Sequence, residues 1–117
     1  MRSTQDWKRS MTKLKQDKVY GLIGLAAKGR NAVSGEFAVE AAIKDGSAYL
    51  VILAEDASDN TEKLFRNKCS FYGVPLYTYG TKDALGQCLG KDVRASVAIV
   101  EEGLARALGK YLEALQN

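Results

Sequence analysis

The stretch Tyr49-Leu50-Val51-Ile52-Leu53-Ala54 decides the fold, because it is a continuous apolar run that ends at Glu55-Asp56-Ala57-Ser58-Asp59-Asn60. A strand that is covered on both faces has this composition, since neither face meets water. The polar segment offers N-caps between Ser58 and Asn60, and a helix is expected from there to about Phe71. The sequence therefore predicts a fully buried central strand that leads into a helix.

The segments on both sides of this strand repeat the alternation of helix and short strand. One run of apolar residues at helical spacing ends at Lys28-Gly29, and Ser34 is a candidate N-cap for a helix that ends at Asp45-Gly46. Such alternation is typical of an α/β fold in which a sheet lies between helices. Further strands are expected at 31–34, 76–79 and 96–100, and further helices at 19–28, 82–89 and 104–115.

The composition is that of an ordinary soluble domain, with 117 residues of which 46% are hydrophobic and 26% charged. No apolar run approaches the ~20 residues of a membrane span, and no signal-peptide pattern is present, so we expect a cytoplasmic protein. The chain has no histidine, and Cys69 and Cys88 are too few for a structural zinc site. We therefore expect buried thiols, no metal or other cofactor, and no enzymatic chemistry.

Positive charge is concentrated at the N-terminus. Residues 1–30 carry eight Lys or Arg against two acids, whereas residues 31–117 carry nine against twelve. Such an asymmetry often marks contact with nucleic acid or an acidic surface, although a solvated basic tail has the same composition. We expect residues 1–16 to be a basic N-terminal extension, either a linker or a weak helix, and residues 17–117 to form the domain.

Two features that suggest catalysis have simpler interpretations. The segment from Gly24 to Asn31 nearly matches a phosphate-binding loop, but Arg30 and Asn31 stand where that pattern requires Lys and then Ser or Thr. The carboxylates of Glu55-Asp56 and Glu101-Glu102 are neighbours in sequence and point apart, so neither pair forms an acid–base dyad. Helix capping and a solvated turn explain both pairs.

Several stretches occur in the order and spacing of a known family. They are Val33-Ser34-Gly35-Glu36, Leu50 to Ser58, Asn67-Lys68-Cys69, Val74-Pro75 and Leu85-Gly86, followed by Gly90-Lys91 with Arg94 and then Ser96 to Ile99. On these residues the chain resembles the ribosomal L7Ae/L30e superfamily of kink-turn RNA-binding proteins, and within it the small bacterial YlxQ branch. The resemblance covers roughly residues 18–105.

The resemblance implies a three-layer α/β/α sandwich with a small mixed four-stranded sheet that binds RNA at one edge. In the family, the amino end of the second helix enters the groove of a kink-turn and reads sheared G·A pairs. The loop before the last strand contacts the flipped-out nucleotide and the backbone. The resemblance further implies a monomeric, non-catalytic protein whose partner is ribosomal or other structured RNA, with the ribosome as a second partner and no membrane contact.

The positions that read the bases depart from the family pattern. Counting back from the central strand places the glycine of the family motif Gly-x-Asn-Glu-x-x-Lys at Gly35. The motif Asn, Glu and Lys then fall on Phe37, Ala38 and Ala41. An alanine cannot hydrogen-bond to a guanine edge. Phe37 is either an aromatic residue that stacks on a base or a residue of the core.

Basic residues at other positions keep the family's character. Lys82 matches a lysine that contacts the RNA backbone, and Lys91 and Arg94 match the basic residues of the loop before the last strand. Lys28 and Arg30 are candidates for further phosphate contacts. The RNA-binding set implied by the resemblance is therefore Arg30, Ser34, Gly35, Glu36, Phe37, Lys82, Lys91 and Arg94.

Two other classes of function stay open on the sequence. A protein-interaction module that has kept the fold and lost specific RNA recognition is favoured by the net negative charge of residues 31–117. An enzyme or enzyme subdomain is disfavoured, because histidine, a complete nucleotide loop and a second domain are all missing from the sequence.

Overall fold

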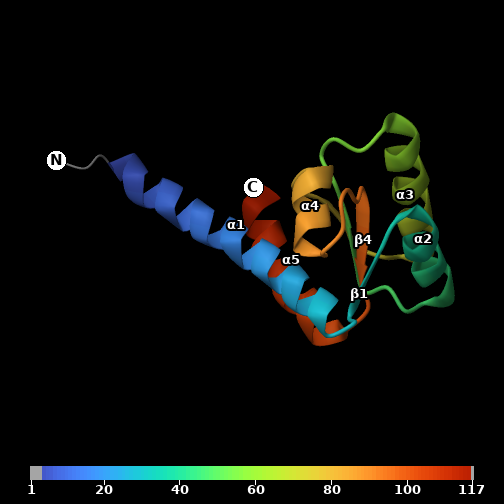
Figure 1. The fold of residues 1–117 in the computed structure, drawn as a ribbon. Helices are drawn as coiled ribbons and strands as arrows, with labels where there is room; N and C mark the ends of the chain where they lie inside the picture. Colours follow the sequence, from blue (N-terminus) through green and yellow to red (C-terminus); the bar gives the residue numbers. More distant parts are fainter. Residues whose placement is uncertain (1–3, 117) are drawn as a thin grey trace.

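The computed structural model describes residues 4–116, and the side chains of residues 9–116. Helices and strands alternate along this part of the chain (Figure 1). Their bounds are α1 Thr4–Lys28, β1 Ala32–Ser34, α2 Glu36–Asp45, β2 Leu50–Leu53, α3 Asp59–Tyr72, β3 Leu76–Thr78, α4 Lys82–Cys88, β4 Ser96–Ile99 and α5 Glu102–Gln116.

The strands form one mixed sheet in the order β1-β4-β2-β3. β4 pairs antiparallel with both β1 and β2, whereas β2 and β3 run parallel. β2 and β4 occupy the two central positions, and every residue of both strands is buried. The predicted central strand is therefore confirmed, since the continuous apolar run lies where helices cover both faces of the sheet.

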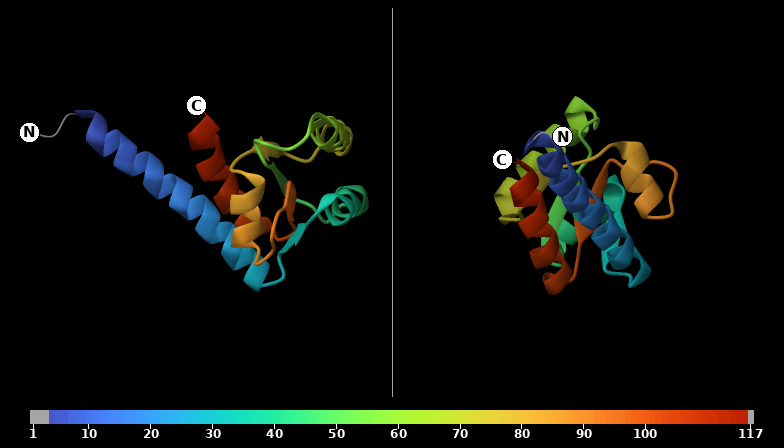
Figure 2. Two further views of the ribbon diagram at one scale, coloured as in Figure 1. Left: turned by 45° about the horizontal axis from the view of Figure 1, so that its top comes forward. Right: turned by 90° about the vertical axis from the view of Figure 1, so that its left-hand side faces the viewer.

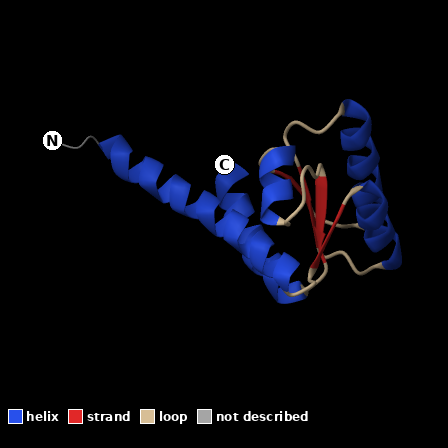
Figure 3. Cartoon of the chain, in the orientation of Figure 1, coloured by secondary structure: helices blue, strands red, loops and turns tan. Residues whose placement is uncertain are grey.

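Each face of the sheet is covered by its own set of helices. Leu50 and Ile52 pack into a core cluster with residues of α1, α4 and α5, whereas Val51 and Leu53 pack with residues of α2 and α3. Figures 1 and 3 show these two groups of helices on opposite sides of the strands, and Figure 2 shows the same layers in two further views. The predicted three-layer α/β/α sandwich is confirmed.

The first helix is longer than predicted. α1 begins at Thr4 and continues to Lys28, so most of the expected extension and the expected helix 19–28 form one continuous helix. No glycine or proline occurs between Thr4 and Tyr20, so nothing in the sequence interrupts the helix at residue 16. The rest of the extension, residues 1–3, lies outside the described residues. Among residues 4–116, none of the helices has both the length and the hydropathy needed to cross a bilayer.

Three of the helices begin with a side chain that accepts hydrogen bonds from free backbone N–H groups. Ser58 Oγ accepts from Thr61 N–H at the start of α3, and Thr81 Oγ1 accepts from Ala84 N–H at the start of α4. Glu101 accepts from Gly103 and Leu104 at the start of α5, and these hydrogen bonds lower the pKa of its carboxyl. The capping interpretation of Glu101 is confirmed, while Glu102 pairs with Arg106 on the helix surface.

The cysteines follow the sequence prediction in part. Cys69 is buried in α3, and burial raises the pKa of its thiol to about 11. Cys88 lies half-buried at the end of α4, and both thiols are free.

Candidate nucleic-acid interface

The start of α2 differs from the starts of α3, α4 and α5 because no side chain caps it. The N-cap residue is Gly35, with φ 93° and ψ 152°, a conformation that only glycine adopts without strain. Its N–H donates to the Ser96 carbonyl at 3.1 Å, which anchors the turn to β4. Ser34 was expected to cap this helix, and that expectation is wrong, because Ser34 lies in β1 and its hydroxyl is used elsewhere.

Arg94 lies beside this open helix start. Its Nε donates to Ser34 Oγ at 3.1 Å, and its backbone N–H donates to the Lys82 carbonyl at 3.1 Å. Arg94 therefore joins the end of β1 to the start of α4 and brings two cationic residues to the edge where α2 begins. The free N–H groups of a helix and its dipole favour negative charge, and the guanidinium adds to the same positive potential.

A close contact holds the loop that carries Arg94. A Cβ built on Gly86 would lie 2.6 Å from the Asp92 carbonyl oxygen, so only glycine lets this loop pack against α4. Lys91 N–H donates to the Gly86 carbonyl at 2.8 Å on the same stretch. Because the loop before β4 packs on α4, Arg94 lies next to the start of α4, where its N–H donates to the Lys82 carbonyl.

Asp56 also contributes to this edge, and sequence reasoning did not select it as a site residue. One of its carboxylate oxygens accepts a hydrogen bond from Lys82 N–H at 2.8 Å. This bond fixes the start of α4 to the segment that follows β2. The signal available in the sequence was the position of Asp56 in the polar segment that follows the central strand, where α/β proteins often place function.

Phe37 lies in the first turn of α2 with 88% of its surface exposed. This exposure excludes the interpretation of Phe37 as a core residue. Ala41 is exposed and Ala38 half-buried on the same helix, so two motif positions present only methyl groups. The adjacent Glu36 is exposed as well, and it places a carboxylate next to the positive groups.

Comparison with known proteins shows the family to which the chain belongs. Residues 17–109 match the family model of the ribosomal protein L7Ae/L30e/S12e/Gadd45 family. The chain belongs to this family. Among curated relatives, it is 40% identical over 94 residues to the RNA-binding protein YlxQ of Bacillus subtilis, covering 80% of this chain and 94% of that protein. It is 34% identical over 98 residues to RNA-binding protein YlxQ of Enterococcus faecium, covering 84% and 94%.

Solved structures share the family fold. A Bacillus halodurans protein of unknown function superposes with a TM-score of 0.79 at 34% identity, covering 82% of this chain and 97% of that one. The Giardia lamblia 15.5kD RNA binding protein superposes with a TM-score of 0.72 at 24% identity, covering 90% of each chain. At that identity the second likeness concerns the fold alone.

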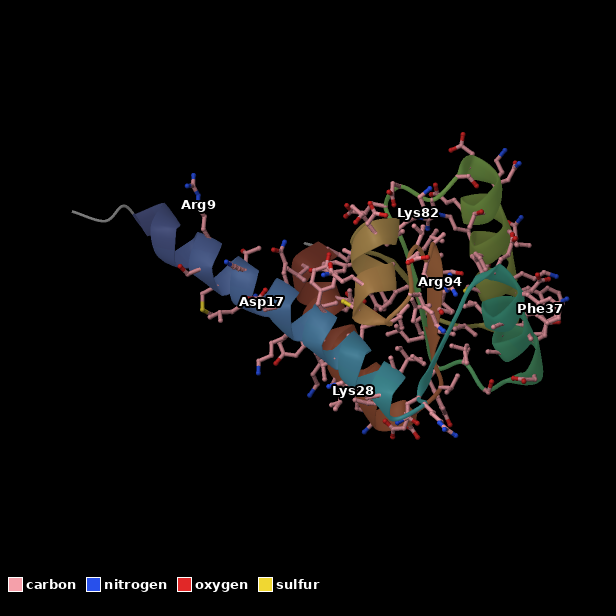
Figure 4. The ribbon with its side chains drawn as sticks, viewed as in Figure 1. Arg9, Asp17, Lys28, Phe37, Lys82 and Arg94 are labelled. Atoms are coloured by element: carbon pink, nitrogen blue, oxygen red, sulfur yellow. The ribbon has the colours of Figure 1, made fainter. Side chains whose placement is uncertain are left out.

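The structure brings together some of the residues that the family resemblance selected and separates others. Ser34, Gly35 and Arg94 meet at the end of β1, with Lys82 next to them. Glu36 and Phe37 follow directly on α2, and Figure 4 shows Phe37, Lys82 and Arg94 on this part of the molecule. Lys91 is exposed farther along the loop that ends at Arg94.

Arg30 lies apart from this group. β1 pairs with β4 so that Ser34 is opposite Val97, whereas the carbonyl of Asn31 accepts from Val100 N–H at the other end of the strands. Arg30 precedes Asn31 in a left-handed turn with φ 60°, and Lys28 ends α1 on that same side. Figure 4 shows Lys28 far from Lys82 and Arg94. The two cations are therefore not placed beside the start of α2.

Proposed function

We propose that this family member binds structured RNA through the edge formed by the start of α2, Arg94 and Lys82. The observation that carries the proposal is the uncapped start of α2 next to a guanidinium that Ser34 holds in place. The curated relatives named as RNA-binding proteins support it, because they match most of the chain. The family description names ribosomal proteins, so ribosomal RNA is the first natural target to test.

Phosphate is the group that this edge suits best. The N–H groups of Glu36, Phe37 and Ala38 have no side-chain cap, so they are available to an oxygen acceptor. Arg94 uses Nε for Ser34 and Nη1 for the Val93 carbonyl, and its remaining N–H groups are available to a phosphate oxygen. Lys82 adds a second charge from the first turn of α4.

The target we propose is a sharply bent RNA of the kink-turn kind, recognised by shape and stacking. Phe37 stands at the helix position where the family motif has a base-reading Asn, and its ring is open to solvent. Single-stranded or extruded bases stack on exposed aromatic rings, whereas bases inside a duplex are not available for such a contact. An RNA with an extruded base therefore gives Phe37 a partner that a plain duplex lacks.

The experiment is a binding titration of the full chain with a standard kink-turn RNA and with a plain duplex of matched length, at low and at physiological salt. We expect tighter binding to the kink-turn at both salt concentrations. The variant Lys82→Gln/Arg94→Gln is expected to lower affinity for the kink-turn by at least tenfold, because lost contacts to charged groups cost about 1.5–3 kcal/mol each.

The matched control is Arg106→Gln/Lys110→Gln, which removes the same charges from exposed positions on α5. This control is expected to bind the kink-turn like the unmodified chain. Equal and salt-sensitive binding to both RNAs would show non-specific phosphate contact and would contradict the kink-turn proposal. No binding to either RNA would favour the protein-interaction module.

A further inference from the structure

The N-terminal part of α1 projects beyond the three layers. Val19, Ile23 and Ala26 are the residues of α1 that are buried in the core. Residues 9–18 are exposed apart from the half-buried Lys15, and Figure 2 shows this segment running away from the rest of the molecule. The described chain measures 53 Å along its longest axis against 30 and 27 Å along the others. We call residues 9–18 the arm.

The helical period shows which side of the arm carries each charge. Tyr20 packs against Tyr79 with ring centroids 5.2 Å apart, and a Cβ on Gly24 would lie 3.6 Å from the Cys88 carbonyl of α4. At 3.6 residues per turn, Arg9 and Lys13 lie on the same side of α1 as Tyr20 and Gly24. The arm therefore carries these two cations on the side of α1 that faces α4.

The charge of this side is only partly compensated. The ion pairs recorded among residues 9–116 lie in α2, α3 and α5, and none of them involves the arm. Asp17 is the acidic residue of the arm, and it lies near the same side, because its charge adds to the burial and other causes that raise the pKa of Tyr79. Arg9 and Lys13 are thus exposed cations on the part of α1 that projects past α4. Asp17 is the one carboxylate of the arm, and it lies between them and the rest of the domain.

We propose that Arg9 and Lys13 make a second contact with the bound RNA, on the phosphate backbone of a stem that flanks the bend. The inference rests on the proposed function, because it takes the RNA to be bound at the candidate interface. Helix α4, which the arm's cations face, carries Lys82 of that interface on its first turn. In Figure 4 the side chain of Arg9 points to the upper side of the molecule, on which Lys82 also lies. The family match begins only at residue 17, so this contact is additional to the part of the chain shared with the family.

The length of the arm sets which RNAs it reaches. A helix rises 1.5 Å per residue, so Lys13 lies about 10 Å and Arg9 about 17 Å along the axis from Tyr20. A kink-turn RNA with short stems ends before it reaches the side chains of Arg9 and Lys13. A stem that is longer by one helical turn extends alongside them. The contact is therefore expected to depend on the length of the stem and to be independent of its sequence.

The test compares two kink-turn RNAs that differ only in stem length, the longer one extended by a helical turn at both ends. Affinity of the full chain is measured against salt concentration. Each phosphate contact contributes about 0.7–0.9 to the slope of log affinity against log salt, so the longer RNA should give a slope steeper by roughly 1.5. Arg9→Gln/Lys13→Gln should abolish this difference and leave binding to the short RNA unchanged.

Two further variants of the arm sharpen the test. Lys15→Gln/Lys18→Gln removes the same charge from the opposite side of the helix and should keep the extra slope. Asp17→Asn removes the carboxylate near the two cations and should tighten binding to the long RNA only.

Equal slopes for the two RNAs in the unmodified chain would overturn the arm contact while leaving the proposed function standing. An equal loss of slope in both double variants would overturn the assignment to Arg9 and Lys13. Failure of the proposed function gives a different result, in which the unmodified chain prefers neither kink-turn RNA to a plain duplex, and both proposals fall.

Discussion

Two serines that precede helices, Ser34 before α2 and Ser58 before α3, have different hydrogen-bond partners. Ser58 Oγ accepts from Thr61 N–H at 3.2 Å and closes the start of α3. Ser34 Oγ accepts from Arg94 Nε at 3.1 Å, and the start of α2 is left without a cap. The same residue type thus stabilises one helix and positions a cation beside the other.

The difference arises because a glycine stands between Ser34 and its helix, whereas Ser58 directly precedes its own. Ser58 is itself the N-cap of α3, with an extended backbone, whereas Gly35 takes that position in α2 with φ 93°. The glycine moves Ser34 back into β1, out of reach of the first turn of α2 and next to the loop before β4. A capped start adds stability, and an open start keeps N–H groups for a ligand.

The largest expected effect comes from removing the contact that holds the Arg94 loop. Gly86→Ala places a Cβ 2.6 Å from the Asp92 carbonyl, so the loop must shift away from α4. We expect the free energy of unfolding to fall by about 1–3 kcal/mol, as for overpacked sites, and RNA affinity to fall with it because Ser34 loses its partner. Urea denaturation and RNA titration of the same preparation measure both quantities.

The control for this variant is Gly21→Ala, another glycine in a helix. A Cβ at Gly21 meets nothing within 4 Å, so the substitution should raise stability by about 0.5–1 kcal/mol and leave RNA affinity unchanged. Equal loss of stability in both variants would show that the Gly86 contact has no special role.

The next effect concerns the exposed aromatic ring at the open helix start. Phe37→Ala is expected to weaken binding to a kink-turn RNA by about 1–3 kcal/mol, the range for a base stacked on an aromatic side chain. Stability should hardly change, since the ring makes no part of the core. Phe71→Ala, on the exposed end of α3, removes a similar ring as a control, and an equal loss of RNA affinity there would contradict the role of Phe37.

The two serines provide a direct test of the comparison. Ser58→Ala should lower the free energy of unfolding by about 1 kcal/mol through the lost cap and leave RNA affinity unchanged. Ser34→Ala should lower RNA affinity by about 1 kcal/mol, since Arg94 loses the acceptor that holds it, with little change in stability. Thermal melts and RNA titrations distinguish the two variants, and a reversed pattern would refute the division of roles.

The smallest expected effect concerns the carboxylate beside the open N–H groups. Glu36 is exposed in the first turn of α2, where its charge opposes an approaching phosphate. Glu36→Gln should tighten RNA binding by roughly twofold at low salt, and the gain should fade as salt screens the repulsion. Weaker binding by this variant would instead indicate that Glu36 accepts a hydrogen bond from the RNA.

Local pattern predicted the parts of the fold that depend on neighbouring residues. The apolar run of β2, the cap Ser58 and the glycine stop after α2 lie where the sequence placed them. Each of these features follows from side chains within a few positions of one another, so it can be recognised without knowledge of the tertiary structure.

The site depended on contacts between distant residues, which no local pattern contains. Ser34 and Arg94 are far apart in sequence, and Asp56 reaches Lys82 across two elements. Phe37 was ambiguous because an aromatic residue in an amphipathic helix suits either core or surface, and only the packing of α2 decides between them. The start of α1 stayed open between a linker and a weak helix, because residues 9–18 are almost all exposed and no buried stripe marks them.

The most direct measurement is the change in backbone amide NMR shifts when a kink-turn RNA is added to the full chain. We predict the largest changes at Glu36, Phe37 and Ala38 and at Arg94, since these groups line the open start of α2. The capped start of α3, at Asp59 to Thr61, should change little. Large changes at the start of α3 with none at the start of α2 would contradict the account.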